Sequence, residues 1–229
     1  MKKAILLSSF FAVAAALAGT VTSGNTVGAL DVSIEDNDEK LVAVPFEGYD
    51  GSAVKVNEML KTQGLGVGSK LYVAKAGGYD VWTLNENGQW GSDTIINDGV
   101  QGESAPAASA SVARGNAFWL KAVNTGTAYL LGQKPASDSA EVTAAQGMNL
   151  IGNPKIVKGN VLAAIQSPET GDELTVADTN GFQKKYTYST AKGGWCCRTG
   201  GSISTITELW LEAGESCWLN AKAARTVRW

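Results

Sequence analysis

The stretch GNAFWL at Gly115–Leu120 returns as GESCWL at Gly214–Leu219, 99 positions further along the chain. Each copy has a glycine followed by a short run that ends in Trp-Leu, which is typical of a strand leaving a turn. Other pairs of similar segments occur in the same order, at spacings of 103 to 109 residues: Gly68–Ala74 with Gly171–Ala177, Gly88–Trp90 with Gly193–Trp195, and Leu41–Pro45 with Leu150–Pro154. Similar segments in a fixed order predict an internal duplication.

Each half carries the same string of expected elements. A short apolar run ends at Pro45 or Pro154, and proline closes a strand because it has no N–H to donate. Apolar residues at helical spacing follow over Val56–Leu60 and Val161–Ile165, and then come runs separated by glycine-bearing turns. The pattern predicts an all-β protein of two tandem antiparallel β-rich repeats, of sandwich or barrel type, each with one short helix. Separate domains and one shared sheet both remain open.

Turn and linker residues set the expected boundaries. Gln133–Ser139 (QKPASDS) carries turn and linker residues, so we divide the chain into 1–18 as a signal peptide, 19–135 as the first repeat and 136–229 as the second. Val100–Val112 is rich in Ala, Ser, Gly and Pro without a period, which predicts a long surface loop inside the first repeat.

The N-terminus has the three parts of an export signal. Lys2 and Lys3 are followed by an apolar region over Ala4–Leu17, and Ala16–Ala18 fits the small-x-small cleavage rule. The apolar region is shorter than the ~20 residues of a membrane span, although an uncleaved anchor is the alternative. We therefore expect an exported protein of the extracellular space, cell surface or periplasm, with no transmembrane helix in the mature chain.

Composition excludes several kinds of chemistry. The 229 residues include 19 Lys and Arg, 22 Asp and Glu, and no histidine, which gives a formal net charge of −3. Without imidazole there is no Ser-His-Asp relay, no Cys-His pair and no histidine-ligated metal. The acidic balance also disfavours nucleic acid as a partner. No cofactor or metal motif occurs, so we expect no cofactor and no metal.

Four motifs resemble those of a group of uncharacterised exported bacterial proteins. They are Val27-Gly28, the strand Lys40–Phe46 (KLVAVPF), the strand Gly115–Trp119 (GNAFW) and the turn Gly132–Pro135 (GQKP). The resemblance spans most of the mature chain and implies an exported, β-rich protein. It implies no activity and supplies no catalytic residue.

The three cysteines lie near the end of the second repeat. Cys196 and Cys197 follow Trp195, and Cys217 precedes Trp218. Because an exported protein meets an oxidising compartment, a disulfide from Cys196 or Cys197 to Cys217 is expected, with one thiol left over. A nucleophilic or metal-binding role is the alternative, although no histidine is available to activate a thiolate.

Aromatic residues are the best candidates for a binding site. Trp90 and Trp195 both follow glycine-rich turns and recur at matching places, and Trp210 has no counterpart in the first half. Exposed indoles stack against the apolar C–H face of a sugar, so these three are the candidate ligand-binding residues, for an extracellular glycan or another envelope protein. Packing under a loop is the alternative, and for Trp119 and Trp218, on duplicated strands, a core role is favoured.

Two other classes of function remain as alternatives. Glu35, Asp36, Asp38 and Glu39 cluster in a turn, where a solvated surface is the usual role, but paired carboxylates would allow an extracellular hydrolase. The terminal Trp229 on a last expected strand is also found in outer-membrane-associated β proteins. The composition favours a non-catalytic exported protein that acts as a surface, matrix or binding module, without catalytic residues and with its oligomeric state open.

Overall fold

A computed structural model describes residues 27–49, 51–75, 78–92, 94–97, 100–103, 110–177 and 183–229. These residues form antiparallel sheets with two short α-helices, so the predicted all-β class is confirmed. The expected signal peptide, 1–18, lies outside the described residues. No helix in the described part of the chain is long and apolar enough to cross a membrane.

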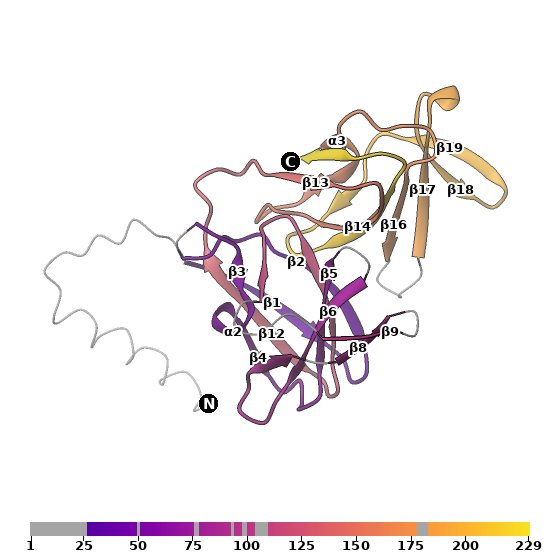
Figure 1. Cartoon of the computed structure of the whole chain (residues 1–229). Coiled ribbons are helices and arrows are strands. Elements are labelled where there is room, and N and C mark those ends of the chain that lie inside the picture. Colours follow the sequence, from indigo (N-terminus) through magenta and orange to yellow (C-terminus); the bar gives the residue numbers. More distant parts are fainter. Residues whose placement is uncertain are drawn as a thin grey trace, which may run out of the picture.

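Strands β1 to β12 build the first half, drawn in indigo to magenta in Figure 1. The orders of hydrogen-bonded strands in its four sheets are β1-β12-β4, β10-β3, β2-β11-β5-β6-β7 and β8-β9. The bounds are β1 (Val27–Ile34), β2 (Glu39–Ala43), β3 (Val54–Lys55), α2 (Val56–Met59), β4 (Leu60–Gln63), β5 (Lys70–Lys75), β6 (Gly78–Leu84), β7 (Trp90–Ser92), β8 (Thr94–Asn97), β9 (Val100–Glu103), β10 (Ser111–Val112), β11 (Ala117–Lys121) and β12 (Gly126–Gln133).

Strands β13 to β22 build the second half, drawn in salmon through orange to yellow in Figure 1. The strand orders in its three sheets are β13-β22, β15-β20 and β14-β21-β16-β17-β18-β19. The bounds are β13 (Glu141–Ala144), β14 (Gly147–Gly152), β15 (Gly159–Asn160), α3 (Val161–Ala164), β16 (Glu173–Ala177), β17 (Gln183–Ser189), the 3₁₀ turn η3 (Thr190–Lys192), β18 (Gly194–Thr199), β19 (Ser202–Ile206), β20 (Trp210–Leu211), β21 (Ser216–Ala221) and β22 (Arg225–Arg228).

Strand order and register in the two halves correspond. The order β2-β11-β5-β6-β7 of the first half has its counterpart in β14-β21-β16-β17-β18, and β3 pairs with β10 as β15 pairs with β20. Trp119 on β11 lies opposite Leu41 and Tyr72. Trp218 on β21 lies opposite Leu150 and Thr175, the residues that the sequence alignment of the halves matches to them.

The segment Val100–Val112 was predicted to be one long loop, but it contains two short strands. Its ends form β9, which pairs with β8, and β10, which pairs with β3 across Val112 and Val54. Val112 is buried in the core of the first half, and this burial provides the free energy that such a short strand needs. Residues 104–109 lie outside the described residues.

Two hydrophobic cores occupy the two halves. Alternate residues of β11, Phe118 and Leu120, belong to the first core, and Cys217 and Leu219 of β21 belong to the second. Strand residues alternate between faces, so Trp119 and Trp218 point the other way. Both indoles are half-buried and pack outside these two cores, Trp218 against a third apolar cluster and Trp119 against Trp218.

The two halves meet at a junction built from Leu41, Ala43, Ala117, Leu150 and Trp218, with Trp119 against Trp218. Across it the amide of Ala43 donates to the carbonyl of Gly214, and the amide of Gly152 donates to the carbonyl of Gly115, both at 2.8 Å. Each bond is the counterpart of the other when the halves are exchanged. The junction therefore has approximate two-fold symmetry.

Glycine at Gly115 and Gly214 is required by this close approach. Both have positive φ, 84° and 80°. A Cβ at Gly115 would lie 2.4 Å from Val142 of the second half, and a Cβ at Gly214 would lie 2.5 Å from Leu30 of the first. The glycines that open the two repeated motifs therefore let each half approach the other.

Candidate functional site

Trp90 and Trp195 are core residues. Their exposed fractions are 2% and 4%, so neither indole can offer a face to a ligand in solution. Trp195 packs edge to face against Tyr188, with ring centroids 5.5 Å apart. The interpretation of Trp90 and Trp195 as ligand platforms therefore disagrees with their burial, because β7 and β18 turn these side chains inward.

The strand end that carries Trp90 is fixed by a side chain. The side-chain Oδ1 of Asn57 accepts from the backbone N–H of Trp90 at 2.7 Å, and its Nδ2 donates to the backbone carbonyl of Trp90 at 3.0 Å. These two bonds imitate a strand neighbour, which β7 lacks on its outer side near this point. The Asn57 side chain thus fixes the backbone of Trp90, while core packing fixes its indole ring.

Trp210 is the predicted platform that faces solvent. Its exposed fraction is 47%, and the next residue, Leu211, is fully buried. This alternation follows from β20, whose pairing with β15 sets Trp210 opposite Asn160. A buried anchor beside an exposed indole fixes the outward direction of the ring.

Polar groups flank the Trp210 ring on two sides. The indole Nε1–H donates to Glu208 Oε2 at 3.2 Å, and Lys158 Nζ lies 5.2 Å from the ring centroid. The Lys158 ammonium lies over one face of the indole, where the ring quadrupole attracts a cation. Sequence reasoning missed Lys158, which is distant from Trp210 in the sequence. It also passed over Glu208, although residues two apart in an extended segment lie on the same side.

Asn160 holds the loop in front of Trp210. Its Oδ1 accepts from the N–H of Leu209 at 3.1 Å and from that of Leu162 at 3.2 Å, the second bond capping α3. Its Nδ2 donates to the carbonyl of Thr207 at 3.4 Å. One amide side chain therefore couples the helix, the loop and β20, and it limits the motion of the ring and of Glu208.

A second amide fixes the segment that carries Lys158. Asn153 is fully buried, and its Nδ2 donates to the carbonyls of Val157 and Leu211 at 2.8 and 2.9 Å. Its Oδ1 accepts from the N–H of Lys155 at 3.0 Å. The result is a preorganised surface around Trp210, which we call the Trp210 site: Lys158, Glu208 and Trp210. Beside it Val157 is 59% exposed.

The three cysteines are free and buried. The expected disulfide from Cys196 or Cys197 to Cys217 is not formed. Two strands, β16 and β17, lie between β18 and β21, so the cysteines are separated along the sheet by about 14 Å, at ~4.8 Å per strand. A disulfide needs Cα atoms within about 7 Å. Burial also raises the pKa of the Cys217 thiol, which disfavours a reactive thiolate.

The acidic turn between β1 and β2 is engaged in local contacts. Asp38 caps the N–H of Glu39 at 2.8 Å, and the hydroxyl of Thr125 donates to Glu35. Glu39 pairs with Lys121 at 2.8 Å, and this hydrogen bond raises the pKa of Lys121. These exposed contacts stabilise the turn. Within the described ranges, no group of three or more Cys, Asp or Glu residues could hold a metal ion.

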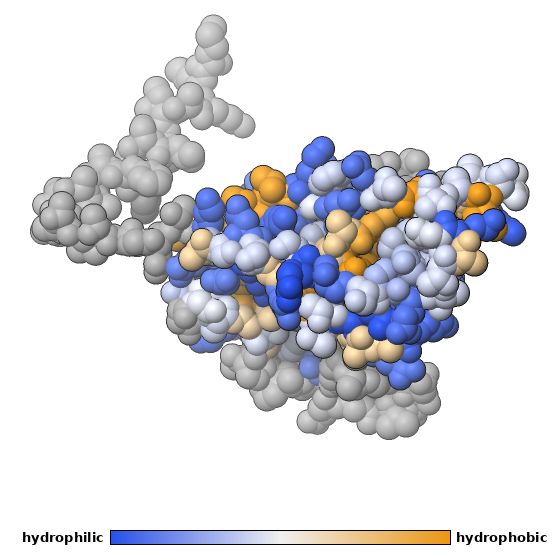
Figure 2. All heavy atoms as spheres, turned by 90° about the horizontal axis from the view of Figure 1, so that it is seen from above, coloured by the Kyte–Doolittle hydropathy of each residue, from blue (hydrophilic) through white to orange (hydrophobic). Residues whose placement is uncertain are grey.

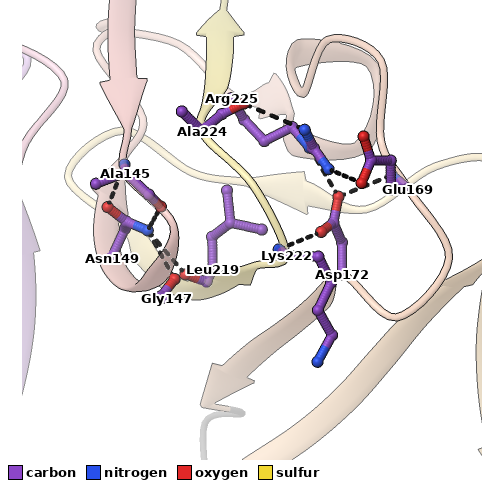
Figure 3. Close-up of polar contacts among 9 residues, drawn as sticks. All are labelled: Ala145, Gly147, Asn149, Glu169, Asp172, Leu219, Lys222, Ala224 and Arg225. Atoms are coloured by element: carbon purple, nitrogen blue, oxygen red, sulfur yellow. Dashed lines mark hydrogen bonds and ion pairs between the residues drawn. The ribbon is translucent and has the colours of Figure 1, made fainter.

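A buried ion pair in the second half was not predicted. Asp172 is fully buried, and its Oδ2 accepts from Arg225 Nε at 3.0 Å (Figure 3). Arg225 also pairs with the exposed Glu169 at 3.0 Å. Burial alone would raise the pKa of Asp172, but bonds from the N–H groups of Glu169 and Lys222 and from Arg225 outweigh it and hold the pKa below its ordinary value.

The first half has a serine at the corresponding place. Ser69 is fully buried and accepts from the N–H of Val123 at 3.0 Å, as Asp172 accepts from the N–H of Lys222 at 2.7 Å. The corresponding backbone N–H groups thus donate to a neutral hydroxyl in one half and to a carboxylate in the other. The carboxylate needs Arg225, which explains why the pair is confined to the second half.

An apolar cavity of about 300 Å³ lies where the halves meet. Leu30, Phe46 and Lys134 line it from the first half, and Ile156 and Ala213 line it from the second. Phe46 rests on Gly28 and Gly132: a Cβ added at Gly28 would lie 2.4 Å from its ring, and one added at Gly132 would lie 2.4 Å from its Cβ. Figure 2 shows apolar residues as separate patches within a largely polar surface on the face that it presents.

No family model matches the chain, and no curated protein or solved structure matches it. The resemblance to exported bacterial proteins therefore stays a prediction.

Proposed function

We propose that this chain is a non-catalytic exported protein that acts as a surface, matrix or binding module and that it binds glycan at the Trp210 site. The observation that carries the proposal is the half-exposed ring of Trp210, held between Glu208 and Lys158. Export rests on the sequence of residues 1–18.

The chemistry of the Trp210 site suits a sugar. A pyranose ring has an apolar C–H face and a rim of hydroxyls, and a flat indole with polar neighbours complements both. Glu208 can accept from sugar hydroxyls, and Lys158 can donate to them. Because Asn160 and Asn153 hold the surrounding loops, little conformational entropy is lost on binding.

We further propose that the two halves arose by tandem duplication of one β module. The corresponding registers of β11 and β21 and the exchanged hydrogen bonds of Ala43 and Gly152 support this proposal. Trp210 corresponds in register to Ser111 of the first half, so the proposed site belongs to one copy alone.

Retention on insoluble polysaccharides tests the function. The purified protein is incubated with cellulose, chitin and xylan, and the bound fraction is measured. Trp210→Ala should weaken binding at least about tenfold, equivalent to ~1.4 kcal/mol, whereas Tyr49→Ala should not. Tyr49 is the matched control, because it is an aromatic residue 51% exposed in the first half. Equal retention of wild type and Trp210→Ala would contradict the proposal.

A further inference from the structure

The outer edge of β19 is open. In the six-stranded sheet, β19 pairs with β18 and with no other strand of the described residues. The opposite edge strand, β14, is covered by the first half through the bond from Gly152 to Gly115. Four of the five residues of β19 are exposed, and the fifth, Ile206, is half-buried. Figure 1 shows the β18–β19 hairpin projecting from the second half, away from the first.

Nothing in the sequence of β19 protects this edge. Exposed edge strands usually carry lysine, proline or a bulge, which prevent pairing with another chain. Ser202–Ile206 reads SISTI, without a charge or a proline, and its pairing with β18 runs without a bulge from Ser202 to Ile206. An unprotected, uncharged edge with β-branched residues is a template for another strand.

The turn determines which backbone groups face outward. Gly200 and Gly201 have positive φ, 56° and 88°, so they form a two-residue turn of the primed type, and the pair Thr199–Ser202 that closes it is hydrogen-bonded. Hydrogen-bonded pairs alternate along an antiparallel ladder. The N–H and C=O groups of Ile203 and Thr205 therefore point away from β18.

We propose that β19 pairs with β19 of a second copy of this chain, antiparallel about a two-fold axis at Ser204. Ile203 then lies opposite the partner's Thr205, and the two residues exchange both backbone hydrogen bonds, as their symmetry mates do. The occupant is a second copy because the strand is complementary to itself: the residue on the axis is a small serine, and no charge meets a like charge.

The test is the oligomeric state of the purified protein by sedimentation equilibrium. Ile203→Pro removes the outward N–H without touching the bonds to β18, and it should weaken dimerisation at least about tenfold. Ile203→Thr keeps the N–H and a β-branched side chain, and it should dimerise as wild type does. Circular dichroism checks that both variants are folded.

If Ile203→Pro does not fold, Ile203→Lys replaces it, because lysine keeps the backbone donor but sets two like charges near the axis. It should also weaken the dimer at least about tenfold, and less so at high salt. A wild-type protein that stays monomeric up to about 1 mM would overturn the proposal. So would a dimer that the proline or lysine variant leaves unchanged.

Discussion

Trp119 and Trp218 meet edge to face at the junction of the two halves, with ring centroids 6.1 Å apart. They occupy corresponding positions on β11 and β21, so each half offers the same residue to the other. The bonds from Ala43 to Gly214 and from Gly152 to Gly115 repeat this relationship in the backbone. The junction is organised as the interface of a symmetric dimer is, although one chain supplies both sides.

Gly152→Ala should destabilise the protein by about 1–3 kcal/mol, because the added Cβ would lie 2.4 Å from the Cβ of Ala43. Gly91→Ala is the control, since its Cβ would meet nothing closer than 3.8 Å. Urea unfolding of the three proteins measures the difference. Equal midpoints for Gly152→Ala and wild type would show that the junction is not tightly packed.

Trp119→Leu and Trp218→Leu should be coupled. Edge-to-face aromatic pairs contribute about 0.5–1.5 kcal/mol beyond burial, so the double variant should lose less stability than the sum of the single losses by that amount. Trp119→Leu combined with Trp195→Phe is the control pair, and its effects should add, because Trp195 lies in the core of the second half. Additivity of the first pair would contradict the observed contact.

Asp172→Asn should destabilise the protein by about 3 kcal/mol, since it removes the buried carboxylate that pairs with the buried Arg225. Glu169→Gln removes the other carboxylate from the same guanidinium, but Glu169 is 61% exposed and its loss should cost less than about 1 kcal/mol. Chemical denaturation at neutral pH measures both. Equal destabilisation of the two variants would contradict the claim that the buried Asp172–Arg225 pair contributes more to stability than the exposed Glu169–Arg225 pair.

The contribution of Asp172 to stability should depend on pH. Its pKa in the folded state lies below its ordinary value, so the folded protein binds fewer protons there than the unfolded chain does. The stabilisation is fully present above the unfolded pKa of about 3.9 and is lost as the pH falls through the folded pKa. The difference in unfolding free energy between wild type and Asp172→Asn should therefore shrink below about pH 4. A difference that grew on acidification would contradict this assignment.

All three cysteines should be present as free thiols. Because they are buried and free, a thiol reagent should react slowly with the native protein and with three groups per chain in denaturant. The protein should be taken from an oxidising compartment, where a disulfide would have formed if the geometry allowed it. One reactive thiol per denatured chain would mean that two cysteines are bonded and that the strand order between β18 and β21 is different.

Local patterns were enough to predict the fold class but not the faces of the strands. Glycine turns and alternating runs marked β11 and β21, because turn chemistry is local. Whether Trp90 points inward depends on which side of β7 is covered, and that depends on Asn57 and the first core. The recurrence of Trp90 and Trp195 reflects their similar places in the two cores, not a shared binding role.

The least predictable features join residues that are distant in sequence. Asp172 reads as one more surface acid, because its partner Arg225 lies 53 positions away. Val112 was predicted to lie in a loop, since two residues of β10 carry no period of their own and depend on pairing with β3. Trp210 was found by its residue type alone, and the sequence contained no signal for Lys158, which the fold brings over its ring.

Indole N–H resonances offer the most direct test of the Trp210 site. Isotope-labelled protein has seven tryptophans, and Trp210→Phe identifies the signal of Trp210. Titration with soluble cellohexaose, chitohexaose and xylohexaose should shift the Trp210 signal with at least one of these sugars, while the signals of the buried Trp90 and Trp195 stay in place. A Trp210 signal that none of the sugars moves, or shifts confined to the buried indoles, would contradict the glycan-binding account.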